Sequence, residues 1–145
     1  YILWHCHRQD PEGGFSILVD GLRIYDAMSE EEKALLRGID LMEHCVFKDD
    51  LDHHPMIQET EWGLRIYYSF WMADGNLSGE EKSAFEAFSK RVKDAEAIKF
   101  RLRPGECLII DNGRVLHGRS SLSVDSDRLL KRYWLGDSEL ERIRD

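Results

Sequence analysis

Residues 101–137, RLRPGECLIIDNGRVLHGRSSLSVDSDRLLKRYWLGD, contain the pattern that decides the fold. Pro104-Gly105 suits a tight turn, because proline fits its second position and glycine tolerates positive φ at its third. An apolar strand follows, and Asn112-Gly113 is a strong signal for a two-residue hairpin turn. The returning strand, residues 114–117, then holds His117 on a rigid ladder of hydrogen bonds. This part of the chain is therefore predicted to be antiparallel β-sheet.

Similar strand signals recur over the rest of the chain. Short runs rich in β-branched and aromatic residues are separated by turn residues, which is typical of a mostly β domain. These runs are residues 1–6, 15–19, 64–70, 98–102, 108–110 and 114–117. Between them, residues 47–61 have clustered Asp and His and little periodicity, and we expect a long surface loop there.

Two stretches have helical periodicity instead. Each begins with a capping box, in which Ser29 is followed by Glu32 and Ser78 by Glu81. Both helices are expected to turn an apolar face toward the core. The residues of these faces are Leu35, Leu36 and Ile39 in the first helix and Phe85, Phe88 and Val92 in the second.

Length and charge limit the classes of function. With 145 residues, 42% of them hydrophobic, the chain is long enough for one domain, so residues 1–145 are predicted to form a single domain with a single site. The net charge of -8 argues against a nucleic-acid partner, because binding to phosphates needs a basic surface. No apolar run approaches the roughly 20 residues that a membrane-spanning helix needs, so no membrane partner is expected.

The three cysteines, Cys6, Cys45 and Cys107, form no CxxC pair. An odd number without such a motif provides neither a disulfide framework nor a cysteine-rich zinc site. We therefore expect a reducing, cytoplasmic setting.

His117 and Arg128 are the candidate functional residues. A histidine at a strand end is more often structural than a metal ligand, but Gly118 lets the chain leave the strand without crowding His117. Arg128 lies at the start of another apolar run, and a buried arginine among strands needs an anionic partner. Its planar fork suits a carboxylate held by two hydrogen bonds.

Three stretches carry a resemblance to a known family. They are the segment quoted first, residues 4–21 (WHCHRQDPEGGFSILVDG), and DHHPMI at 52–57 followed by GLRIYYSFW at 63–71. In these segments the sequence resembles the taurine dioxygenase and γ-butyrobetaine hydroxylase superfamily of Fe(II)- and 2-oxoglutarate-dependent oxygenases.

The resemblance implies a mainly β (α+β) fold, a double-stranded β-helix or jelly roll with flanking helices. It implies Fe(II) at one mouth of the barrel, held by two histidines and a carboxylate, with positions open for 2-oxoglutarate and O2. His117 matches the distal iron ligand, and Arg128 matches the arginine that binds the remote carboxylate of 2-oxoglutarate. Ser16 matches a threonine that donates a hydrogen bond to that carboxylate. The implied reaction hydroxylates an aliphatic carbon of a small polar metabolite, with decarboxylation of 2-oxoglutarate to succinate.

The sequence departs from the family at the first two iron ligands. In the family a His-x-Asp or His-x-Glu lies shortly before the strand that is here residues 1–6, and neither motif occurs in the 145 residues. We therefore expect a domain that lacks its N-terminal part, including this motif. His5 and His7 alternate on a strand that is structural in the family, so they are not expected to replace it.

Arg132 has two open interpretations. It either reaches the substrate or co-substrate or pairs with a surface acid such as Asp137. His53 and His54 are expected in a solvated loop, and Asp111 and Arg119 are expected to hold the hairpin by hydrogen bonds.

The aromatic residues of the middle segment also have two interpretations. Trp62, Tyr67, Tyr68 and Trp71 are either core residues or a cage for a quaternary ammonium substrate.

Two alternatives to a hydroxylase remain. One is a halogenase on the same scaffold, in which a small residue replaces the carboxylate ligand and chloride takes its place. The other is a non-catalytic jelly-roll binding module or truncated product. The sequence leaves the substrate and homo-oligomer formation open.

Overall fold

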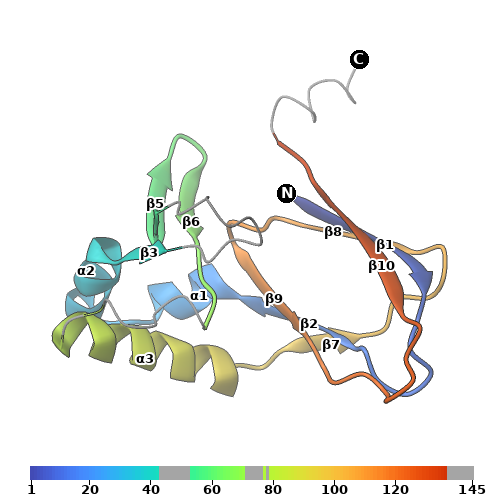
Figure 1. Cartoon of the computed structure of the whole chain (residues 1–145). Helices are drawn as coiled ribbons and strands as arrows, with labels where there is room; N and C mark the ends of the chain where they lie inside the picture. The colour runs from blue at the N-terminus through green and yellow to red at the C-terminus, as the bar shows by residue number, and fades with distance from the viewer. Residues whose placement is uncertain (43–52, 71–76, 78, 137–145) are drawn as a thin grey trace. The chain divides into compact units, whose positions relative to one another are not determined.

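The computed structural model describes residues 1–42, 53–70, 77 and 79–136, which belong to two compact units. Unit 1 comprises Tyr1–Val19 and Ala97–Asp145, and unit 2 comprises Asp20–Glu96. Strands predominate over helices (Figure 1), so the predicted mainly β class is confirmed. The single domain expected for residues 1–145 stays a prediction.

Unit 1 contains two three-stranded sheets. In the first, β1 lies between β10 and β8 and is antiparallel to both. In the second, β2 lies between β7 and β9. The bounds are Ile2–Arg8 for β1, Ser16–Asp20 for β2, Ile98–Phe100 for β7, Cys107–Ile110 for β8, Val115–Arg119 for β9 and Leu129–Trp134 for β10.

The two sheets face each other across a small core. The Trp4 ring of β1 meets the His117 ring of β9 edge to face, with 4.7 Å between their centroids. Alternation along β1 places Ile2 and Cys6 on the same face as Trp4, and both are fully buried. The two sheets of unit 1 fit the jelly roll that the family resemblance implied.

The turn at Pro104-Gly105 forms as predicted. The amide of Glu106 donates to the carbonyl of Arg103 at 3.0 Å, and Gly105 has a φ of +88°. That backbone conformation is costly for a residue with a Cβ, which explains the glycine.

The predicted hairpin at Asn112-Gly113 is wrong. Strand β8 pairs with β1, whereas β9 belongs to the other sheet, so the segment between them is a corner that crosses from one sheet to the other. Asp111 makes this corner: its carbonyl accepts from the Val115 amide at 2.8 Å, and its Oδ1 accepts from the Gly113 amide at 2.9 Å. Gly113 also lacks the positive φ that a two-residue hairpin turn requires.

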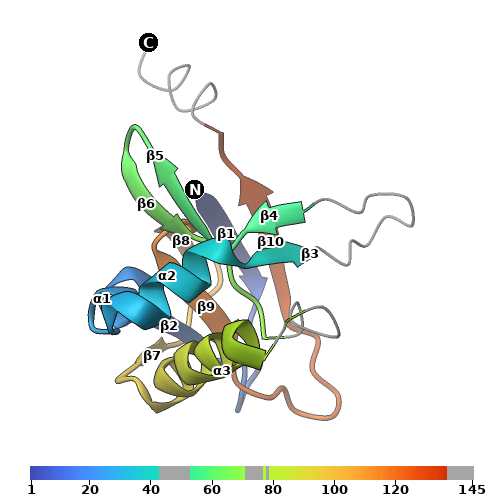
Figure 2. The same ribbon diagram turned by 90° about the vertical axis from the view of Figure 1, so that its left-hand side faces the viewer.

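The described residues of unit 2 form three helices and two hairpins, which Figure 2 shows from a second direction. Helix α3 runs beside α2 in both views. None of the helices in the described residues is long and apolar enough to cross a membrane. The bounds are Gly21–Asp26 for α1, Glu30–Gly38 for α2, Gly79–Asp94 for α3, Asp40–Met42 for β3, His53–Pro55 for β4, Ile57–Thr60 for β5 and Gly63–Ile66 for β6.

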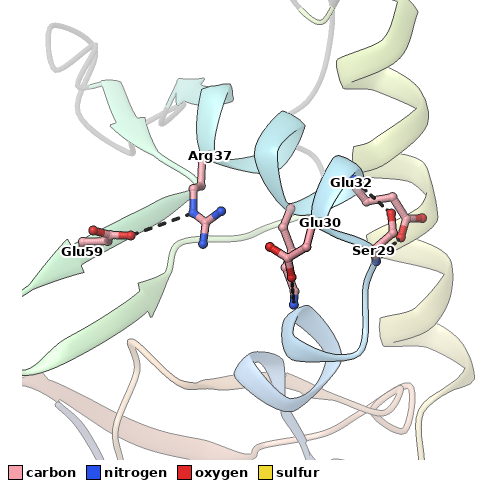
Figure 3. A network of polar contacts seen from close by, with 6 residues as sticks. Ser29, Glu30, Glu32, Arg37 and Glu59 are labelled. Carbon is pink, nitrogen blue, oxygen red and sulfur yellow. Dashed lines mark hydrogen bonds and ion pairs between the residues drawn. The ribbon is translucent and has the colours of Figure 1, made fainter.

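The capping box of α2 is confirmed. The Ser29 hydroxyl accepts from the Glu32 amide at 3.2 Å, and the Glu32 carboxylate accepts from the Ser29 amide at 3.0 Å (Figure 3). The same carboxylate accepts two hydrogen bonds from Arg91 of α3, at 3.0 and 3.2 Å. The box therefore also ties α2 to α3. The predicted Ser78 box of α3 includes a residue outside the described part of the chain.

The apolar faces predicted for the two helices lie in the core of unit 2. Leu36 and Ile39 of the first helix and Phe85 and Phe88 of the second are buried, and Leu35 and Val92 are half-buried.

The long loop expected at residues 47–61 is wrong for residues 53–60, which form β4 and β5. Within the described residues, β4 pairs with β3 and β5 pairs with β6, as two-stranded hairpins. Met56 and Ile57 between them are buried. Backbone pairing and two apolar side chains thus stabilise a segment whose composition is polar. Residues 47–52 lie outside the described chain.

Candidate active site

His117 lies on β9, and its partly exposed side chain contacts the Trp4 ring. Within the described residues, no hydrogen bond occupies either ring nitrogen. Surrounding protein atoms remove water from the ring and lower the pKa of His117, and the charge of Arg132 lowers it further. The ring is therefore neutral near pH 7, the form that binds a metal ion through nitrogen.

The other ligands of a metal site are not assembled with His117. In the portion of the chain that the structure describes, no three His, Cys, Asp or Glu side chains form a group able to hold a metal ion. His5 and His7 contact each other with their rings 4.4 Å apart, but alternation places them on the opposite face of β1 from Trp4. The described residues thus fit one position of an iron site and do not fit a whole triad.

Arg128 carries a half-buried positive charge just before β10. Its Nε donates to Gln9 Oε1 at 2.9 Å, and among the described residues it forms no ion pair. Burial lowers the pKa of Arg128 and the nearby Arg119 lowers it further, while the Asp10 carboxylate raises it by less. Burial and Arg119 both oppose the charged form, so an anion bound beside this guanidinium would be stabilised.

Ser16 begins β2, only two residues after Gly14, over which the Arg128 arm lies. The residue is buried, and its hydroxyl has no hydrogen-bond partner within the described chain. Because β2 and β9 are neighbours in one sheet, Ser16 and His117 occupy adjacent strands. The predicted hydrogen bond from Ser16 to a ligand carboxylate stays a prediction.

Arg132 lies near His117. It is paired across the sheet with Trp4, and its guanidinium lies over the Trp134 ring, 5.2 Å from the centroid. Of the two interpretations left by the sequence, this position is compatible with contact to a ligand at His117. Asp137, the alternative partner, lies outside the described residues.

Two aromatic residues of the middle segment, Tyr68 and Trp62, lie in different surroundings. Tyr68 packs between Phe85 and Phe88 of α3, and its hydroxyl donates to Ser89 at 3.1 Å. Trp62 is 78% exposed in the turn between β5 and β6. Tyr68 is thus a core residue and Trp62 a surface residue, so the cage is not formed by these two. Trp71 is outside the described chain.

Two residues that the sequence analysis missed, Gln9 and Asp10, adjoin Arg128. Asp10 is fully buried, and its carboxylate accepts from the amides of Glu12 and Ser123, each at 2.9 Å. The run Asp10-Pro11-Glu12-Gly13 has the chemistry of a turn closed by an aspartate side chain, which was a usable signal. Nothing in the sequence indicated Gln9, because its partners lie about a hundred residues away.

Solved structures with the same fold include an asparagine oxygenase and a taurine dioxygenase. An asparagine oxygenase in complex with Fe(II), 2S,3S-3-hydroxyasparagine and succinate matches with a TM-score of 0.74 and 20% identity, over 90% of this chain and 43% of that one. A taurine dioxygenase from Burkholderia xenovorans matches with a TM-score of 0.70 and 20% identity, over 90% of this chain and 50% of that one. At such identities these likenesses show the fold alone. The jelly-roll architecture expected from the sequence is thereby confirmed.

A third structure, AAD-2 in complex with Mn(II) and N-oxalylglycine, matches with a TM-score of 0.71 and 16% identity, over 90% of this chain and 60% of that one. The chain thus spans between 43% and 60% of the length of these three structures. At the level of sequence, residues 1–134 match the family described as "Taurine catabolism dioxygenase TauD, TfdA family". Since the match covers nearly the whole sequence, the chain belongs to this family.

Proposed function

We propose that these residues are part of an Fe(II)- and 2-oxoglutarate-dependent oxygenase that hydroxylates an aliphatic carbon of a small polar metabolite. The observation that carries the proposal is the environment of the Arg128 guanidinium. The residue is half-buried, charged, next to a second arginine and without an ion-pair partner among the described residues. Such a group is suited to bind a carboxylate with its two terminal amino groups.

In this proposal Arg128 binds the remote carboxylate of 2-oxoglutarate. Leaving that carboxylate unpaired in a protein interior would cost several kcal/mol, and the arginine removes this cost. The free hydroxyl of Ser16 donates a hydrogen bond to the same group. Together the two residues fix the orientation of the co-substrate, so that its 2-oxo end is directed toward the metal.

His117 is the proposed metal ligand of this chain. Its ring is neutral, and its nitrogens have no other partner within the described residues. We propose that the two remaining ligands, a His-x-Asp or His-x-Glu pair, come from residues outside these 145. When iron is bound, it supplies the oxidising chemistry with O2 and 2-oxoglutarate, and the products are hydroxylated substrate, succinate and CO2.

A cytoplasmic location is part of the same proposal. Cys6 and Cys107, the two cysteines in the described chain, are both free thiols. A reducing compartment keeps thiols in this state.

Succinate formation by the protein that contains these residues tests the proposal. With Fe(II), O2 and 2-oxoglutarate, we expect succinate and CO2 in equal amounts. His117→Ala should abolish their formation. Arg128→Ala should raise the KM for 2-oxoglutarate about 100-fold, because it leaves a bound carboxylate unpaired. Arg103→Ala, which removes an exposed arginine of the same unit, is the matched control. It should change neither succinate formation nor the KM for 2-oxoglutarate.

Other results would contradict the proposal. A chlorinated product formed in the presence of chloride would identify a halogenase. An absence of succinate despite a full complement of iron would favour a binding module. Unchanged affinity for 2-oxoglutarate in Arg128→Ala would show that the co-substrate carboxylate lies elsewhere.

A further inference from the structure

The Gln9 side chain is held by backbone groups from two parts of unit 1. Its Nε2 donates to the carbonyl of Leu102 at 2.9 Å, and its Oε1 accepts from the amide of Asp10 at 2.9 Å. These partners fix which end of the amide is oxygen, because a carbonyl needs a donor and an amide N–H needs an acceptor. The oxygen end therefore faces Arg128.

Among the described residues, only the Nε edge of the Arg128 guanidinium therefore has a side-chain hydrogen-bond partner. Its Nε donates to Gln9 Oε1 at 2.9 Å, and its two terminal amino groups have no partner among the described residues. Four N–H bonds thus remain in the planar fork that suits a carboxylate. Because Gln9 is neutral, it orients the guanidinium without cancelling its charge.

Gly14 makes room for this arrangement. A Cβ at this position would lie 2.9 Å from both Cδ and Nε of Arg128, and also 2.9 Å from Gln9 Oε1. The residue has a φ of +67°, which disfavours a side chain as well. The arginine arm can therefore pass directly over the backbone and reach Gln9.

We propose that Gln9 is a positioning residue for the co-substrate. It fixes the Nε edge of Arg128 so that the two terminal amino groups face the remote carboxylate of 2-oxoglutarate. Gly14, which has no side chain, leaves room for the Arg128 side chain. This inference rests on the proposed function, in which Arg128 binds that carboxylate.

The test compares two ligands in the metal-loaded protein without oxygen. The first is 2-oxoglutarate, and the second is 2-oxopentanoate, which has a methyl group in place of the remote carboxylate. Gln9→Met preserves the size of the side chain and removes all three of its hydrogen bonds. Gln9→Glu keeps an acceptor for Nε but adds a negative charge beside Arg128. Gln58→Met makes the same exchange in unit 2 and is the matched control.

Gln9→Met should weaken the binding of 2-oxoglutarate about tenfold, as expected for one lost hydrogen bond to a charged group. It should leave the affinity for 2-oxopentanoate within about twofold, because that ligand lacks the carboxylate that Arg128 binds. Gln9→Glu should weaken the binding of 2-oxoglutarate at least as much, since the introduced carboxylate competes with the ligand for the guanidinium. In turnover, Gln9→Met should raise the KM for 2-oxoglutarate and leave kcat nearly unchanged.

A double variant separates this inference from the proposed function. In an Arg128→Ala background, Gln9→Met should have no further effect on 2-oxoglutarate binding. The positioning role would be overturned if Gln9→Met had its full effect in the Arg128→Ala background. It would also be overturned if Gln9→Met weakened the binding of 2-oxoglutarate and 2-oxopentanoate equally. If Arg128→Ala weakens 2-oxoglutarate but Gln9→Met does not, the inference fails and the proposed function stands. If Arg128→Ala has no effect, the proposed function itself fails.

Discussion

Asp10 is a buried carboxylate that joins two loops near Arg128. Besides the amides already described, it accepts from the Ser123 hydroxyl at 2.8 Å. Hydrogen bonds, above all from the Ser126 hydroxyl and then from the Gly13 amide, hold the pKa of Asp10 well below its ordinary value of 3.8. The residue thereby connects the turn after β1 to the segment that leads into Arg128.

Asp10→Asn should lower the melting temperature by several degrees at neutral pH, because the amide nitrogen replaces an acceptor that faces several donors. The folded-state pKa is depressed, so the contribution of Asp10 is complete above the unfolded-state value of 3.8 and is lost as the pH falls further. The difference in melting temperature between the two proteins should therefore shrink below about pH 4.

Thermal unfolding across pH 2 to 7 measures this effect, a range set by the linkage argument. Asp125→Asn, which alters an exposed carboxylate between Ser123 and Ser126, is the control and should change little. A difference that does not vary with pH would exclude the ionised carboxylate as the source of stability.

At the scale of elements, the corner from Asp111 to Val115 determines where His117 lies, because it carries the chain from one sheet to the other. Asp111→Ala should destabilise the protein by about 1 kcal/mol through loss of the side-chain hydrogen bond to Gly113. Urea unfolding measures the change, with Asn112→Ala as the control in the same corner. Equal effects of the two substitutions would mean that the Asp111 side chain does not hold the corner.

The cap of α2 allows a second test at this scale. Ser29→Ala should cost about 1 kcal/mol, as is usual for loss of an N-cap. Glu32→Ala should cost more, since it also removes the two hydrogen bonds to Arg91. Glu31→Ala, at an exposed neighbouring position, is the control for both in urea unfolding. A larger loss in Ser29→Ala than in Glu32→Ala would contradict the bridging role of Glu32.

Local chemistry explains which elements the sequence could predict. The box at Ser29 and the turn at Gly105 depend on residues within a few positions of each other, and both formed as expected. Helix α1 was missed, although Asp20 caps it through the Arg23 amide at 3.1 Å. At six residues its periodicity was too short to detect.

The error at Asn112-Gly113 concerns pairing over a long distance. Asn112-Gly113 has the local chemistry of a hairpin turn, but β8 finds its partner in β1, more than a hundred residues earlier. Likewise, motifs predicted the roles of His117, Ser16 and Arg128, which stay predictions, whereas the contact between Gln9 and Arg128 required the folded chain. The sequence was enough to predict candidate residues, and the tertiary structure was needed to find the side chain that contacts Arg128.

At the scale of the whole molecule, the number of metal ligands leads to a prediction. A single histidine holds Fe(II) poorly, because affinity and open geometry come from three donors fixed together. Residues 1–145 alone should therefore bind iron weakly and form no succinate, whereas a longer chain that begins upstream of a His-x-Asp or His-x-Glu should do both. Metal analysis and succinate assays on the two lengths check this. Robust turnover by residues 1–145 would mean that the ligands have been misassigned.

The division into units affects how the chain leaves the ribosome. Unit 2 is an uninterrupted stretch, but the two parts of unit 1 are separated by it. A nascent chain that has emerged only as far as residue 96 contains all of unit 2 and just two strands of unit 1. Strand β1 then lacks both of its neighbours, β8 and β10, and its unpaired edges are open to other chains. Unit 1 cannot be completed until β8 and β10 have emerged, and during that interval the unpaired edges of β1 are open to aggregation and to capture by chaperones.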